Sequence, residues 1–212
     1  MTDKLEQAIS DARRGQHEAR AEAERLIERI AAASSAYVVE LAKYYMDRAL
    51  RDRPEVIGAL PQEELSALKA SYEETLVQLP DLTREQVSAM SWPHRAEIPE
   101  SLRTNTIASF DLARQTQEAL DQLVRELVGR VGVLLISAKL ADVKPRSEWK
   151  IVGKSVSYAY GLTEIGAASA QYRKFKEEYR QALDNYTEAS QALYAAERAK
   201  QQATARDRWE KS

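Results

Sequence analysis

The sequence predicts an all-α fold, an elongated helical bundle in which the N- and C-terminal helices form an antiparallel coiled-coil stalk on a thicker helical head. Three observations predict it. Helix formers such as Ala, Glu, Arg, Gln and Leu dominate the 212 residues. The 7 Gly and 6 Pro are unevenly placed, which leaves long stretches near both termini without proline and with few glycines. Apolar side chains recur at coiled-coil spacing in both terminal regions.

The last helix has the clearest repeat, and it is predicted to run from an N-cap at Ser147 to about Asp207. Every seventh residue is large and mostly apolar: Ile151, Tyr158, Ile165, Tyr172, Tyr179, Tyr186 and Leu193. A second position, three residues further on, is mostly alanine: Ala168, Phe175, Ala182, Ala189 and Ala196. This period indicates a supercoiled helix. We expect the tyrosines to be core residues; an exposed aromatic stripe that binds another helix is the alternative.

The first helix is predicted over about residues 3–53, where Pro54 ends it. Its seam has gaps of three and four residues: Ile9, Ala12, Gln16, Ala19, Ala23, Leu26, Ile30, Ala33 and Tyr37. The alanines can receive the tyrosines of the last helix, so we expect the two helices to pair antiparallel. The predicted stalk comprises residues 1–36 and 166–212. The predicted head is residues 37–165, within one structural unit.

Prolines divide the middle of the chain. Pro61 suits the first turn of a helix that Pro80 is expected to end. Thr83 is then expected to cap a short helix to Met90, with Gln86 as its capping-box partner. The next four residues, 91–94, should be extended because a proline follows Trp92.

A second long helix is predicted over residues 99–143, from Pro99 to a break at residues 144–146. It is apolar on most faces from Leu123 onward, as expected of a helix surrounded by others. If it pairs antiparallel with the last helix, Gly129 faces Gly161, and the small residues allow close backbone approach. A hinge at the glycines is the alternative.

Composition limits the compartment and the class of partner. The net charge is −2, which does not favour a polyanion binder, so a nucleic-acid partner is not expected. Cysteine is absent, and the first residues lack the apolar core of a signal peptide. The longest apolar run, residues 131–138, is far shorter than the roughly 20 residues of a membrane span. We therefore expect a cytoplasmic protein, with secretion without a cleaved signal left open.

The sequence contains no recognisable catalytic or cofactor motif. The two histidines, His17 and His94, have no partner at metal-ligand spacing, and we expect both to be solvated. Gly153, Lys154 and Ser155 resemble the end of a phosphate loop but lack its first glycine and a preceding strand. We therefore expect no enzyme, no metal, no cofactor and no small-molecule substrate.

Two charged surfaces are candidate partner sites. The first is a basic tip between the second and last long helices: Lys144, Arg146, Trp149, Lys150 and Lys154. It could touch anionic lipid, nucleic acid or an acidic partner, or its cations could simply lie at a helix C-terminus while Trp149 covers the hairpin. The second is acidic: Glu63, Glu64, Glu73 and Glu74. It could bind a basic partner, including a second copy, or be an ordinary solvated surface.

These features favour a non-enzymatic helical interaction or scaffold protein. It would bind another protein, or a second copy of itself, through the coiled-coil stalk and the charged head. The alternative is a membrane-active protein, α-helical and pore-forming or membrane-remodelling, that uses residues 123–143 and the tip at Trp149. A third and weaker hypothesis is an enzyme or nucleic-acid factor whose site is assembled from scattered residues.

Overall fold

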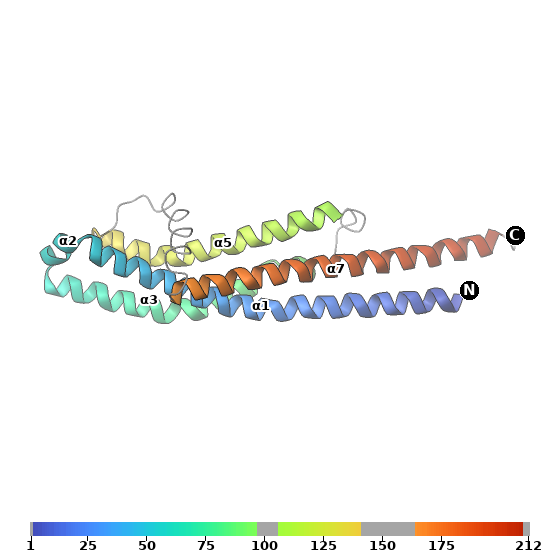
Figure 1. The fold of residues 1–212 in the computed structure, drawn as a ribbon, viewed down its shortest axis with the longest axis horizontal. Coiled ribbons are helices and arrows are strands. Elements are labelled where there is room, and N and C mark those ends of the chain that lie inside the picture. The colour runs from blue at the N-terminus through green and yellow to red at the C-terminus, as the bar shows by residue number, and fades with distance from the viewer. Residues whose placement is uncertain (1, 97–105, 141–163, 210–212) are drawn as a thin grey trace. The chain divides into compact units, whose positions relative to one another are not determined.

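The computed structural model describes residues 2–96, 106–140 and 164–209 (Figure 1). All regular elements among them are helical, which confirms the all-α bundle. In chain order they are α1 (Thr2–Asp52), α2 (Pro54–Ala59), α3 (Gln62–Ala89), the 3₁₀ turn η1 (Pro93–Arg95), α5 (Thr106–Ser137) and α7 (Glu164–Trp209). The chain forms two compact units. Unit 1 is Met1–Ile27, Ser91–Glu118 and Glu177–Ser212; unit 2 is Glu28–Met90 and Ala119–Lys176.

Unit 1 contains the N-terminal part of α1 and the C-terminal part of α7, which run antiparallel (Figure 1). Partner numbers on α7 fall as residue numbers on α1 rise, which sets the direction. The joining pairs are Glu6 with Lys200 at 3.2 Å, Arg13 with Glu197 at 2.9 Å and Gln16 with Ser190 at 2.9 Å. The predicted antiparallel pairing of the terminal helices is therefore confirmed.

Unit 2 contains the rest of α1, all of α2 and α3, and the adjoining parts of α5 and α7. Its buried core includes Ile30, Val38, Leu79, Leu127 and Val131. The antiparallel direction of α1 and α7 holds here too. The guanidinium of Arg29 lies 4.3 Å from the Phe175 ring centroid, and Tyr37 stacks on Tyr172 at 5.3 Å.

The predicted seams lie inside the two units. All nine seam positions of α1 are buried or half-buried. On α7, Tyr172 is 2% exposed, Tyr179 1% and Tyr186 5%. The tyrosines are therefore core residues, as expected, and not an exposed stripe. The predicted boundaries between stalk and head remain a prediction.

Pro80 does not end a helix, which corrects the prediction for this region. α3 continues through Pro80 to Ala89, and Thr83 lies inside the helix rather than at its cap. Its Oγ1 donates to the carbonyl of Leu79 at 2.6 Å. Leu79, Thr83 and Val87 are four residues apart and all buried, so α3 has one continuous buried face within unit 2. We attribute the unbroken helix to this burial, which offsets the cost of about 3 kcal/mol for an interior proline.

The connection after α3 is partly as predicted. Trp92 precedes a proline and has extended backbone, with φ −96° and ψ 127°. Residues 93–95 are not extended but form the 3₁₀ turn η1. The amides of Arg95 and Ala96 donate to the carbonyls of Trp92 and Pro93, which closes the turn.

The second long helix ends earlier than its predicted end at Val143. α5 stops at Ser137, because the chain turns through Lys139, whose φ is +59°. The amide of Leu140 donates to the carbonyl of Leu135 at 2.8 Å, and that of Lys139 to Ile136 at 3.0 Å. Leu135 and Leu140 are both buried. This is a Schellman motif with lysine at the position usually held by glycine.

The close approach predicted between Gly129 and Gly161 stays a prediction, because Gly161 lies outside the described residues. A methyl group added at Gly129, or at its neighbour Gly132, meets no atom within 4 Å among the described residues. The predicted helix starts at Pro99 and Ser147 also lie outside the described residues.

Candidate functional site

The four acidic candidates all lie on the surface of α3 in unit 2. Glu63 and Glu64 are in its first turn, where the helix dipole favours acidic side chains. Glu73 and Glu74 follow along the helix, and all four are exposed. Glu74 accepts a hydrogen bond from Gln78 at 3.2 Å. Their role as a partner site remains a prediction.

The five candidates of the basic tip lie outside the described residues. They are Lys144, Arg146, Trp149, Lys150 and Lys154. The structure therefore offers no geometry for this surface.

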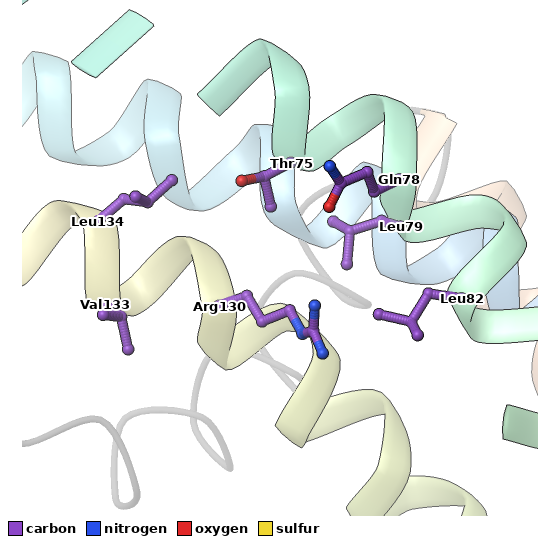
Figure 2. A pocket seen from close by; sticks show the side chains of 7 residues that line it. All are labelled: Thr75, Gln78, Leu79, Leu82, Arg130, Val133 and Leu134. Carbon is purple, nitrogen blue, oxygen red and sulfur yellow. The ribbon is translucent and has the colours of Figure 1, made fainter. Parts of the chain in front are cut away.

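A groove between α3 and α5 opens on the surface of unit 2 (Figure 2). Its volume is about 290 Å³. The lining residues are Thr75, Gln78, Leu79 and Leu82 from α3, and Arg130, Val133 and Leu134 from α5. Four of the seven are aliphatic, so the groove is mainly apolar with a polar border.

Two residues of α5 make this groove unusual. Val133 is 62% exposed, one of the few large apolar side chains so open to solvent in the described chain. Arg130 is exposed, extends toward α3 in Figure 2, and has no ion-pair partner among the described residues. An apolar surface left open by the described residues, beside a guanidinium that none of them pairs, can accept a partner that carries both apolar and acidic groups.

A second candidate is a buried polar cluster in unit 1, centred on His94. The extended Trp92 and the η1 turn direct His94 inward, where its side chain is 0% exposed. Its ring lies between Glu24 of α1 and Tyr179 of α7. Trp92 closes the cluster, with its ring edge-on to Tyr179 at 4.7 Å.

Both ring nitrogens of His94 are hydrogen-bonded. Nδ1 lies 2.9 Å from the hydroxyl of Tyr179, and Nε2 lies 2.8 Å from Oε2 of Glu24. The same oxygen accepts from Nε of Arg95 at 3.0 Å, and Oε1 accepts from the other end of that guanidinium. Tyr179, His94, Glu24 and Arg95 therefore form one continuous chain of hydrogen bonds.

The structure favours the charged form of Glu24 but the neutral forms of His94 and Tyr179. The hydrogen bond from Arg95 is the main reason that the pKa of Glu24 falls to about 2. The pKa of His94 is lowered, chiefly by burial, although Glu24 opposes the shift. Burial raises the pKa of Tyr179. At neutral pH the cluster therefore contains a carboxylate, a guanidinium, a neutral imidazole and a neutral phenol.

A hydroxyl, an imidazole and a carboxylate in series are the connectivity that enzymes use to activate a nucleophile. Here Tyr179 is only 1% exposed and His94 is fully buried, so a substrate cannot reach the hydroxyl in this conformation. The arrangement instead joins the connection 91–96 to α1 and α7.

The sequence-based expectation for His94 is therefore wrong. We expected both histidines to be solvated; His17 is exposed, but His94 is among the most buried side chains described. Its partners lie 70 and 85 residues away in sequence, so no local spacing indicates them. The local sequence indicates the burial of His94 only through the apolar Trp92 and the rigid Pro93 immediately before it.

The described residues contain no cluster of three or more His, Asp or Glu side chains that could hold a metal ion. None of the described helices is both long and apolar enough to cross a bilayer. Comparison with known families, characterised proteins and solved structures finds no match to this chain.

Proposed function

We propose that this protein is a non-enzymatic helical interaction protein that binds a helix of another protein, or of a second copy of itself, in the α3–α5 groove of unit 2. The single observation that supports it is an apolar groove bordered by the exposed Val133 and by Arg130, which has no ion-pair partner in the part of the chain that the structure describes. Amphipathic helices bind in such grooves through apolar side chains one turn apart.

The size of the groove supports a side-chain ligand. About 290 Å³ is roughly twice the ~150 Å³ cavity that holds a benzene ring in a protein interior. That space suits one or two large apolar side chains. An acidic side chain on the same partner helix would pair with Arg130 and fix the orientation of the helix.

The test places a photo-crosslinking residue at Val133, with Ala119 as a control. Ala119 is also exposed on α5 and lies outside the groove lining. We expect irradiation in cells to give a discrete adduct from position 133 and none from position 119. An adduct at twice the chain mass identifies a second copy as the partner. Equal labelling at both positions contradicts the proposal.

The charge contribution is tested by Arg130→Glu in the same crosslinking protein. We expect the adduct at position 133 to be lost or strongly reduced, because an acidic partner residue would then be repelled. Arg114→Glu is the matched control, since Arg114 is exposed on α5 and already paired with Asp111 and Glu118. Co-sedimentation with anionic vesicles, with no protein adduct, would support the membrane-active alternative instead.

A further inference from the structure

We propose that His94 makes the connection 92–95 a pH-sensitive clamp in unit 1, closed while its imidazole is neutral and released when the ring becomes an imidazolium. The inference does not depend on the α3–α5 groove, because all of the residues that carry it belong to unit 1.

The direction of each hydrogen bond follows from the chemistry of the partners. An ionised Glu24 can only accept, so Nε2 of His94, 2.8 Å away, must carry the ring hydrogen. In a neutral ring Nδ1 is then bare and accepts from the hydroxyl of Tyr179 at 2.9 Å. The tautomer is thus assigned from its two partners, and in the closed clamp both ring nitrogens and the Tyr179 hydroxyl are hydrogen-bonded.

A second proton on His94 disrupts this arrangement. It must go to Nδ1, which becomes a donor, so the Tyr179 oxygen must accept and its own hydrogen loses its acceptor. Tyr179 is 1% exposed, so water cannot replace that acceptor while the clamp is closed. An orphaned buried donor and a newly buried charge both cost free energy, and opening the connection to water relieves both.

The surrounding charges act in both directions. Glu24 on α1 favours the imidazolium, whereas Arg20 on α1 and Arg95 on η1 oppose it, and Tyr179 on α7 is neutral. Burial is the largest influence, and the pKa of His94 is lowered. Because the closed state has the lower pKa, it binds fewer protons than the open state. Its stability is therefore complete above pH 6.5 and falls as the pH drops below 6.5.

The reference for the titration is the ordinary histidine pKa of 6.5. Assignment of the ring resonances is simple, since His17 and His94 are the only histidines of the chain. We expect NMR of the full chain to show the His94 ring titrating below pH 6.5. If His94 titrates at or above pH 6.5, or stays neutral until the helices unfold, the clamp is not pH-sensitive.

Trp92 reports the opening, because it is 1% exposed and lies against Tyr179. In a Trp149→Phe/Trp209→Phe variant it is the only tryptophan. We expect acrylamide quenching of Trp92 to rise several-fold as His94 protonates, while far-UV circular dichroism shows the helices intact. Quenching that stays constant while His94 titrates, or that rises only when the helices unfold, would overturn the proposal.

Two variants separate the clamp from general acid instability. His94→Gln removes the titrating ring, and we expect its Trp92 quenching to be independent of pH between 7 and about 5. Should that variant fail to fold, Tyr179→Phe serves instead. This variant removes the hydroxyl from which the neutral ring accepts a hydrogen bond, so the pKa of His94 should move up toward the ordinary histidine value of 6.5. An unchanged midpoint in Tyr179→Phe contradicts the hydrogen-bond argument.

Discussion

Tyr172 donates its hydroxyl hydrogen to Oδ1 of Asp121 across 2.9 Å, which joins α7 to α5 inside unit 2. Lys176, one turn along α7, donates to the same oxygen at 2.6 Å, and its ammonium lies 4.7 Å from the Tyr172 ring centroid. Burial, followed by the charge of Asp121, raises the pKa of Tyr172. One carboxylate therefore satisfies a buried phenol and a largely buried ammonium.

This pairing predicts unequal losses at its two ends. Tyr172→Phe removes one hydrogen bond but leaves Asp121 paired with Lys176, and should cost about 1–2 kcal/mol of unfolding free energy. Asp121→Ala removes the acceptor of the Tyr172 hydroxyl and the carboxylate paired with Lys176, and should cost about 2–4 kcal/mol. Urea unfolding followed by circular dichroism measures both. Asp111→Ala, at an exposed pair on α5, is the control and should cost less than about 0.5 kcal/mol.

Ser34 in unit 2 carries a buried polar atom that is not hydrogen-bonded by the described residues, in contrast to the hydroxyl of Tyr172. Its Oγ is buried and is the only such side-chain atom without a hydrogen-bond partner among the described residues. Ser34→Ala removes that polar atom without leaving a large cavity, and should stabilise the fold by about 1 kcal/mol. Ser190→Ala is the matched control, because Ser190 donates to Tyr186 and accepts from Gln16. Thermal unfolding should move in opposite directions for the two variants.

Lys139, just after the end of α5, has a left-handed backbone conformation. Lys139→Gly should stabilise the protein by about 1 kcal/mol, because glycine adopts this conformation without steric cost. Ala119→Gly is the control, since Ala119 is an exposed helical position on α5 where glycine should cost about 1 kcal/mol. If both variants lose stability equally in urea, the Schellman turn is not formed.

Gly129 and Gly132 on α5 allow a simple substitution test. Gly129→Ala and Gly132→Ala should each stabilise the fold by up to about 1 kcal/mol, because alanine favours the helix and the added methyl meets no described atom. Differential scanning calorimetry of both variants measures the effect. A loss of stability at either position would mean that another surface covers it.

Glu24 should contribute to acid sensitivity at lower pH than His94. Its pKa is lowered from 4.5 to about 2, so the folded state binds fewer protons than the unfolded state in that interval. The stability it contributes is present above pH 4.5 and is lost as the pH falls toward 2. Unfolding midpoints of wild type and Glu24→Gln should differ at neutral pH and converge near pH 2. Glu22→Gln, at an exposed pair with Arg25, is the control.

Periodic features could be predicted because they repeat along a helix. The seams through Ile30 and Tyr179 were recognisable because burial on one helical face imposes a period that many residues share. Helix ends were harder. Pro80 looked like a break because its local cost is known, but the buried face through Leu79 and Val87 is not visible in the local sequence.

By itself, the sequence determined that this chain is helical, which faces of its terminal helices are buried and that these helices run antiparallel, because each depends on repeated local spacing. Tertiary structure decided the rest. His94 meets Glu24 and Tyr179 only after three distant segments pack together, and Arg130 borders a groove only because α3 lies beside α5. Such contacts join single residues far apart in the chain, and no period in the sequence records them.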